Sequence, residues 1–296
     1  MKVTILTPSY NRGHTLPKLY ESLLTQTSSN FEWLVVDDGS KDETEILIKK
    51  YIEEKKIDVR YIKKENGGKH TAVNEGVANI SSEMTFIVDS DDYLSSDAVE
   101  TIELYFNKYK DVKKVCGFSF LRSTIKENKT IGEEYGQNEF IDNYISYRVN
   151  KNIKGDKAEV YYTSVLKQYP FPVYNGERFL SEDVVWIEMA KKYDTLYINK
   201  AIYYCEYLED GLTTNDKKTK FKSPLGSMHR GKQMMYKKLN FKTRIKGAII
   251  YNCYKQEIKQ SVPESLRLTK KKDRILVLLT KVLGKIYNKK WKKSIK

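Results

Sequence analysis

The first 110 residues alternate between short apolar runs and longer stretches in which apolar residues recur every three or four positions. A short apolar run predicts a buried β-strand, whereas the wider spacing predicts one apolar face of a helix. The predicted strands are Val3–Thr7, Phe31–Val36, Val59–Lys63 and Met84–Val88. The predicted helices follow them at His14–Thr27, a stretch that ends at Glu54, Lys69–Ala78 and Asp97–Tyr109. This alternation predicts an α/β fold with a mainly parallel central sheet and flanking helices.

The pattern is less regular after residue 110. Val115–Arg122 and Leu196–Tyr207 are predicted as strands, and Phe140–Val149 as a short helix. The polar stretch 208–214 is predicted as a loop. From about Lys217 the chain becomes rich in lysine and helical in pattern, which predicts a basic helical C-terminal region.

A polar cluster follows each of the first four predicted strands. The clusters are Thr7–Arg12, Asp37–Ser40, Asn66–Lys69 and Asp89–Asp92. The carboxyl ends of parallel strands lie along one edge of a sheet, and ligands bind there, so we expect the four clusters to converge. A turn rich in N–H groups, a carboxylate pair, a Gly-Gly-Lys-His turn and an acidic cluster together suit a nucleoside diphosphate.

The acidic cluster lies in the segment MTFIVDSDDYL, where Asp89, Asp91 and Asp92 come directly after a predicted strand. Carboxylates this close repel one another unless positive charge lies between them. Hard oxygen ligands suit Mg²⁺ or Mn²⁺, and these ions often join a protein to a diphosphate. The alternative is a polar loop that caps the next helix, and the short motif alone does not decide between the two.

Four segments, in this order and spacing, resemble family 2 glycosyltransferases of the GT-A fold: TILTPSYNR, WLVVDDGSKDET, ENGGKHTAVNEG and FIVDSDDYL. The resemblance implies a Rossmann-like fold and transfer of a sugar from a nucleotide donor, usually UDP-linked, with inversion at the anomeric carbon. It also implies a catalytic domain over residues 1–215, with a nucleotide-binding half at 1–110 and an acceptor half at 111–215. The basic helical region then covers 216–296.

The resemblance implies that particular residues contact the UDP-sugar. Thr7, Pro8 and Tyr10 would line the base pocket. Asp38 would accept a hydrogen bond from the uracil, and Lys69 would approach the ribose or the phosphates. Asp38, with the Gly and Ser that follow it, also fits a simple turn and helix cap. The full set implied for the donor is Thr7, Pro8, Tyr10, Arg12, Asp38, Lys69, Asp89 and Ser90.

The resemblance further implies Mn²⁺ or Mg²⁺ as a cofactor. Asp91 would hold the ion against the diphosphate, and Asp89 would reach a ribose hydroxyl or, through water, the ion. His229 is another candidate ligand, because some relatives use a late histidine on a closing loop. The alternative for His229 is a surface histidine with no ligand role.

Two acids, Glu182 and Asp183, lie at the start of a predicted helix in the segment GERFLSEDVVW. Acids at this position suit the helix dipole without any catalytic role. The resemblance implies that one carboxylate removes the proton from the acceptor hydroxyl, which is a poor nucleophile at neutral pH. Asp183 fits the catalytic position, and Glu182 is the alternate because relatives with a similar pattern often lack the aspartate.

The chain carries 53 Lys and Arg against 39 Asp and Glu, and its net charge of +14 predicts an anionic partner. Nucleic acid, an anionic membrane surface and phosphorylated substrates all qualify. Cys116, Cys205 and Cys253 are widely spaced and form no zinc pattern, which favours a reducing compartment. We find no signal-peptide pattern and no run long enough to span a membrane, so we expect a cytoplasmic protein.

The segment from Lys270 to Lys296 has eleven Lys or Arg against one Asp, a net charge of +10. A basic amphipathic helix with a tryptophan, here Trp291, is typical of a membrane-surface anchor, so we expect peripheral attachment at the inner face of the cell membrane. The alternative is that the apolar stripe packs on the catalytic domain or on another subunit. The stripe consists of Ile275, Leu278, Leu279, Val282, Leu283 and Ile286.

The leading hypothesis is an inverting, metal-dependent glycosyltransferase that moves a sugar from a UDP-sugar to a lipid-linked glycan acceptor in bacterial surface polysaccharide synthesis. One alternative is a catalytically weak nucleotide-binding scaffold of a glycan assembly complex. Another is a basic nucleic-acid-binding protein. Two observations argue against it: the positive charge is concentrated in the C-terminal tail, and the sequence has no recognised nucleic-acid-binding motif. The sequence leaves open the sugar, the linkage and whether the protein is a homo-oligomer.

Overall fold

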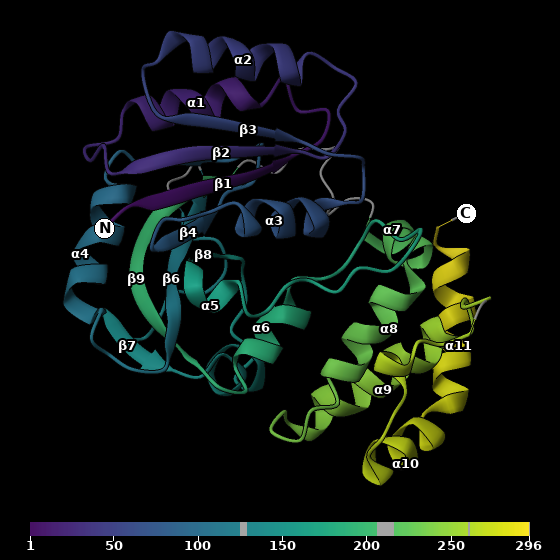
Figure 1. The fold of residues 1–296 in the computed structure, drawn as a ribbon. Coiled ribbons are helices and arrows are strands. Elements are labelled where there is room, and N and C mark those ends of the chain that lie inside the picture. The colour runs from purple at the N-terminus through teal and green to yellow at the C-terminus, as the bar shows by residue number, and fades with distance from the viewer. Residues whose placement is uncertain (125–128, 206–215, 260, 296) are drawn as a thin grey trace. The chain divides into compact units, whose positions relative to one another are not determined.

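The computed structural model describes residues 1–124, 129–205, 216–259 and 261–295 (Figure 1). The predicted loop at 208–214 therefore lies outside the described residues. Within the described ranges, no helix is both long enough and apolar enough to cross a membrane.

The chain folds into two compact units, and each unit has a hydrophobic core of its own. The first unit combines Met1–Asn143, Ile153–Pro170 and Lys192–Tyr207. The second unit combines Tyr144–Asn152, Phe171–Lys191 and Leu208–Lys296. The predicted division into a catalytic domain and a C-terminal region at residue 215 stays a prediction.

One sheet forms the centre of the first unit, with strand order β3-β2-β1-β4-β8-β6-β9-β5 and with β7 paired to β9. Strands β1 to β4 pair in parallel, as the strand–helix alternation predicts. Strand β8 lies antiparallel between β4 and β6, and β6 runs parallel to β9. The strands are β1 Val3–Ser9, β2 Phe31–Asp37, β3 Val59–Lys63, β4 Met84–Ile87, β5 Tyr93–Leu94, β6 Val115–Thr124, β7 Glu139–Asp142, β8 Lys157–Tyr162 and β9 Asp194–Cys205.

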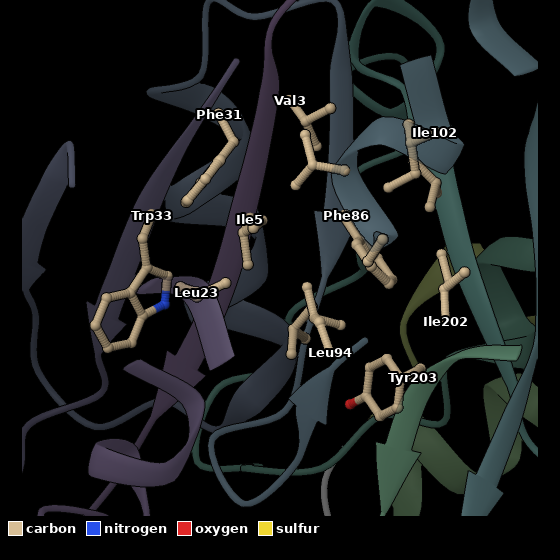
Figure 2. Close-up of a cluster of buried hydrophobic side chains, with 14 of the residues drawn as sticks. Val3, Ile5, Leu23, Phe31, Trp33, Phe86, Leu94, Ile102, Ile202 and Tyr203 are labelled. Carbon is tan, nitrogen blue, oxygen red and sulfur yellow. The ribbon is translucent and has the colours of Figure 1, made fainter. Parts of the chain in front are cut away.

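The helices of the first unit cover both faces of this sheet. They are α1 Leu16–Leu24, α2 Thr44–Glu54, α3 Lys69–Ala78, α4 Ala98–Tyr109 and the short α5 Thr163–Leu166. Side chains of α1, α2 and α4 share a core with Val3 and Ile5 of β1 and with Trp33 of β2 (Figure 2). Leu6, which alternates to the other face, meets α3 so closely that a Cβ added to Gly76 would lie 2.3 Å from Leu6 Cδ1. Burial on both faces explains why these strands have continuous apolar runs.

Most of the predicted elements are confirmed, and β3 and α3 have the predicted bounds. The predicted helix at Phe140–Val149 is wrong over its first part. Phe140 belongs to β7, where it pairs with Tyr197 of β9 and stacks on its ring with 5.2 Å between ring centroids. A π-helix follows at Ile145–Asn150. The long-range aromatic contact overrides the local helical spacing.

The second unit is helical, which confirms the prediction of C-terminal helices. Its α-helices are α6 Asp183–Met189, α7 Asp216–Lys222, α8 Pro224–Gln233, α9 Phe241–Lys255, α10 Lys271–Leu279 and α11 Lys281–Lys293, with a 3₁₀ turn at Glu264–Leu266. Helix α8 packs closely on α9, since a Cβ added to Gly231 would lie 2.6 Å from the backbone nitrogen of Tyr251. Buried Met228, Met235 and Cys253 belong to the core of this unit.

Candidate active site

The turn after β1 is fastened to the turn after β2. Asn11 has a positive φ of 52°, its backbone N–H donates to Ser40 Oγ at 2.8 Å, and its side-chain oxygen accepts from the Lys41 N–H at 2.9 Å. Tyr10 is 44% exposed, so its ring is available to a ligand. Thr7 is buried, and its Oγ1 accepts a hydrogen bond from Trp33 Nε1 at 3.0 Å.

Asp37 ends β2 and Asp38 follows it, and both carboxylates accept hydrogen bonds from protein donors. Asp37 accepts from the Ser40 N–H at 2.7 Å and from the Tyr61 hydroxyl at 2.5 Å. Burial and this hydrogen bond to Asp37 raise the pKa of Tyr61.

Asp38 holds the glycine turn before α3. Its carboxylate accepts from the N–H groups of Gly67 and Gly68 at 2.9 and 2.6 Å and from Lys64 Nζ at 2.8 Å. A carboxylate has about four acceptor positions, and donors among the described residues take three of those of Asp38. His70 lies just beyond this turn and is buried, and burial lowers its pKa to about 4, so its ring is neutral.

Basic side chains surround the acidic cluster after β4. Lys69 Nζ lies 2.5 Å from Asp89 Oδ1, and a guanidinium nitrogen of Arg122 lies 3.7 Å from both Asp89 and Asp92. Arg12 lies 4.0 Å from Asp91. Three carboxylates and three cations therefore meet at the carboxyl ends of β1 and β4.

Tyr203 of β9, which is labelled in Figure 2, contacts this cluster through its hydroxyl and its ring. Its hydroxyl donates to Asp92 at 2.7 Å and accepts from the Asp89 N–H at 2.9 Å. The Arg122 guanidinium lies 4.0 Å from the centre of the Tyr203 ring. The local sequence gives no signal for Arg122 or Tyr203, because both come from later strands of the sheet.

The three carboxylates differ in pKa. Burial works to raise the pKa of Asp89, but Lys69 and Arg122 outweigh it, and the pKa is lowered. Burial and the charge of Asp89 raise the pKa of Asp91. The same two causes raise the pKa of Asp92 to about 7, although Arg122 opposes them.

The fit of a divalent ion depends on Asp91. Among the described residues, no group of three or more His, Cys, Asp or Glu side chains is placed to hold a metal. Mg²⁺ in diphosphate sites is held by one or two carboxylates together with phosphate oxygens and water. Asp91 suits such a site because it is 23% exposed and because a bound cation would offset the burial and the Asp89 charge that raise its pKa. Asp89 already has two cations, and Ser90 is buried beside it.

The acid pair Glu182 and Asp183 lies in the second unit, at the start of α6. Arg230 of α8 donates from Nε to both Asp183 oxygens, at 3.0 and 2.7 Å. Glu177, earlier in the same loop, caps α8 by accepting from the N–H groups of Leu225 and Gly226 at 2.7 and 2.8 Å. The loop from 177 to 183 is thus fixed to α8 at two points, and the sequence did not reveal either of them.

His229 lies on α8 and shares a hydrogen bond between its Nδ1 and the Tyr174 hydroxyl at 2.8 Å. Burial, assisted by the charge of Lys232, lowers the pKa of His229 to about 4, so the imidazole is neutral. Its role as a metal ligand stays a prediction.

The predicted donor residues thus lie in the first unit, at the carboxyl ends of three neighbouring strands. They are Thr7 and Pro8 at the end of β1, Tyr10 and Arg12 after β1, Asp38 after β2, Lys69 at the start of α3, and Asp89, Ser90 and Asp91 after β4. Glu182, Asp183 and His229 lie in the second unit.

Curated relatives are mostly longer proteins that match this chain over part of their length. Glycosyltransferase GlyA of Streptococcus pneumoniae is 41% identical over 103 residues, which are 34% of this chain and 14% of that protein. A Campylobacter jejuni protein, GalNAc(5)-diNAcBac-PP-undecaprenol beta-1,3-glucosyltransferase, is 25% identical over 238 residues, or 78% of this chain and 73% of that protein. The first two curated relatives are covered over only 14% and 37% of their length.

Solved structures share the fold. The structure of Staphylococcus aureus TarS residues 1–349 in complex with UDP-GlcNAc has a TM-score of 0.63 at 16% identity, over 99% of this chain and 92% of that chain. This likeness confirms the predicted GT-A fold. The family model described as glycosyl transferase family 2 matches residues 4–163, which is just over half of the 296 residues. The protein belongs to glycosyl transferase family 2.

Proposed function

We propose that the protein transfers a sugar from a UDP-sugar, with inversion and with the help of a divalent ion, to a lipid-linked glycan acceptor in bacterial surface polysaccharide synthesis. The observation that carries the proposal is the cluster of Asp89, Asp91 and Asp92 with Arg12, Lys69 and Arg122, inside the region matched by the family. The UDP-GlcNAc complex of TarS supports the donor class. The undecaprenol-linked substrate in the name of the C. jejuni relative supports the acceptor class.

The first unit would bind the donor. The exposed Tyr10 ring offers a surface for a nucleobase, and an N–H of uracil would be a fourth donor to the Asp38 carboxylate. Lys69 and Arg12 are the cations nearest to Asp89 and Asp91, and they would meet the diphosphate.

Asp91 would hold the divalent ion. A bound ion supplies positive charge beside the diphosphate leaving group. His229, with its neutral ring, is kept as a second candidate ligand.

The second unit would supply the base, with Asp183 as the first candidate and Glu182 as the alternate. The acceptor hydroxyl gives its proton to the carboxylate, and its oxygen forms a bond to the anomeric carbon. The bond from that carbon to the diphosphate oxygen breaks, and the electron pair leaves with the diphosphate. Attack from the face opposite the leaving group inverts the anomeric carbon. Arg230 would keep the Asp183 carboxylate in one orientation.

We also propose that the protein works in the cytoplasm, at the inner face of the cell membrane. A lipid-linked acceptor is held there, and the net charge of +10 after residue 269 supports contact with an anionic surface.

A thermal-shift panel tests the donor proposal. UDP, UDP-GlcNAc, UDP-glucose and UDP-galactose are each added with and without Mn²⁺, and a ligand that binds only the folded protein raises the melting temperature. We expect a Mn²⁺-dependent rise with at least one of them, and loss of that dependence in Asp91→Asn. The matched control is Asp58→Asn, since Asp58 is a half-exposed surface aspartate. The absence of any rise in the unchanged protein, or a Mn²⁺-dependent rise that survives in Asp91→Asn, would overturn the site.

Turnover separates the two candidate bases. We expect Asp183→Asn to keep the donor-induced thermal shift and to lose sugar transfer. We expect Glu182→Gln to retain most of the sugar transfer. The reverse result would assign the base to Glu182. Full transfer in both variants would contradict the proposal for this acid pair.

A further inference from the structure

The last two helices carry most of their apolar side chains on the outside, although Leu276 of α10 is buried. In a helix that packs on a protein core, the apolar stripe faces the core. Here Leu279 of α10 is 74% exposed and Val282 of α11 is 68% exposed. We call this exposed set the outer apolar stripe; it consists of Ile275, Leu278, Leu279, Val282, Leu283, Ile286 and Tyr287.

Small and polar residues make several of the inner contacts of α11, while Leu276 of α10 and Trp291 of α11 pack on the core of the second unit. A Cβ added to Gly284 would lie 2.4 Å from Asn252 Cβ, so α11 approaches α9 closely at this glycine. Buried Asn288 donates to the Cys253 carbonyl at 2.9 Å and to Glu257 at 2.6 Å. Asn252 of α9 donates to Thr280 between the two helices at 3.1 Å. The part of α11 from Val282 to Asn288 therefore has polar and small residues inside and apolar residues outside, the reverse of an ordinary packed helix.

Helix geometry separates these two faces. Residues four apart lie on the same face, so Val282 and Ile286 form one face while Gly284 and Asn288 form the opposite one. The apolar face is followed one turn later by Lys289 and Lys293, which are exposed. The packing of α11 on α9 thus settles the direction of the stripe, which sequence periodicity leaves open.

The charge around the outer apolar stripe is strongly positive. Exposed Lys281, Lys285 and Lys290 lie on α11 beside the stripe. Asp273, the one acid in this region, lies 3.6 Å from Arg244 of α9. Lys292 lies 2.7 Å from Glu257. The stripe itself is bordered by lysines.

We propose that the outer apolar stripe and its bordering lysines bind the surface of an anionic lipid bilayer. Apolar side chains enter the boundary between headgroups and acyl chains, and lysines attract anionic headgroups. A second copy of the chain fits less well, because the same lysines would face one another at the interface. This surface deepens the proposed membrane location, but it rests on α10 and α11 and not on the donor site.

Co-sedimentation of the full chain with lipid vesicles tests this inference. One set of vesicles contains phosphatidylcholine alone, and the other also contains phosphatidylglycerol. We expect binding to the second set, and a fall in its partition coefficient of at least about tenfold in Leu279→Ser/Val282→Ser, since both side chains lose their apolar insertion. The matched control is Ile46→Ser/Leu104→Ser, two side chains that are 72% and 63% exposed on α2 and α4. This control should bind like the unchanged protein.

A charge variant tests the lysines separately. We expect Lys285→Gln/Lys289→Gln to reduce binding to phosphatidylglycerol vesicles by about fivefold for each lysine, and added salt to have the same direction of effect. The UDP-sugar thermal shift should be unchanged in all of these variants. Loss of vesicle binding can therefore be distinguished from loss of donor binding.

Three outcomes would overturn the inference. The first is no binding of the unchanged protein to phosphatidylglycerol vesicles. The second is equal binding by Leu279→Ser/Val282→Ser. The third is a dimer in sedimentation velocity that these two substitutions dissociate while vesicle binding stays the same, which would assign the stripe to a second copy of the chain.

Discussion

The charged side chains of the acidic cluster after β4 are largely buried and paired, whereas those on the surface of α10 and α11 are mostly exposed. In the cluster, Asp92 and Arg122 are largely buried and lie 3.7 Å apart, and the apolar side chains of the unit are packed in its core. On α11 the lysines are exposed while Asn288 is buried and Leu283 is exposed. Both regions are rich in charge, so composition alone does not separate them.

This difference indicates which kind of ligand or surface each region suits. Buried charges need partners of opposite sign, and the cluster supplies them within the chain. Such a balanced site can accept a charged ligand by exchanging one partner for another. Exposed lysines beside exposed apolar side chains have no such balance, and they suit a surface that is both anionic and apolar.

Among the polar and charged positions of the two regions, the largest effect on stability is expected at the buried charges. Arg122→Met should lower the free energy of unfolding by about 3–5 kcal/mol, because Asp89 and Asp92 would lose the cation between them. Urea unfolding followed by circular dichroism measures the loss. Lys49→Met is the control: it removes an exposed pair with Glu45 and should cost under about 0.5 kcal/mol. Equal losses in the two variants would contradict the account of the cluster.

The next effect concerns the loop that carries the acid pair. Glu177→Ala should cost about 2 kcal/mol, because two N–H groups at the start of α8 would lose a buried acceptor. The melting temperature and hydrogen exchange of the Leu225 and Gly226 amides report the change. The exposed Glu264 gives the control variant Glu264→Ala, which should leave both readouts in place. Unchanged hydrogen exchange of these two amides in Glu177→Ala would show that the Glu177 carboxylate does not stabilise the start of α8.

A smaller loss is expected from the inner face of α11. Asn288→Ala removes one hydrogen bond to the Cys253 carbonyl of α9 and one to Glu257 just beyond α9, and should cost about 1–2 kcal/mol. Lys289→Ala, the neighbouring change on the outer face, should be nearly neutral. Thermal unfolding of the two variants compares the faces directly. A larger loss in Lys289→Ala would show that the faces have been assigned the wrong way round.

The smallest effect is expected on the outer face itself. Leu279→Ala should change the free energy of unfolding by less than about 0.5 kcal/mol, since the side chain is 74% exposed. Phe86→Ala, in the core of the first unit, should cost about 3–5 kcal/mol (Figure 2). Denaturant titration of both variants measures this contrast. A cost near that of Phe86→Ala would mean that Leu279 is covered in solution.

The first half of the fold could be predicted because each strand is buried on both faces and each helix repeats its apolar positions. Val59–Lys63 and Lys69–Ala78 carry that information locally. Phe140 does not, because its place in β7 depends on Tyr197, which lies far away in the sequence. The insertion of β8 between β4 and β6 also depends on long-range pairing.

The acids of the site could be predicted, but their partners could not. Asp89 and Asp91 follow a strand, and strand ends share an edge by topology. Arg122 reaches the cluster only because β6 and β9 lie side by side and bring it to Tyr203. The pairing of Arg230 with Asp183 likewise depends on how α8 packs. In the C-terminal helices the stripe was visible from spacing, but its direction was set by the packing of α11 on α9.

The turn that Asp38 holds has a consequence for how donor preference can change. Asp38 binds the N–H groups of Gly67 and Gly68, and the next residue, Lys69, contacts Asp89. The base end and the phosphate end of the proposed donor site are therefore joined through three consecutive residues. A substitution at Asp38 would also move Lys69, the residue proposed to meet the diphosphate. We therefore expect that homologues with a different residue at position 38 also differ in the residues around Lys69.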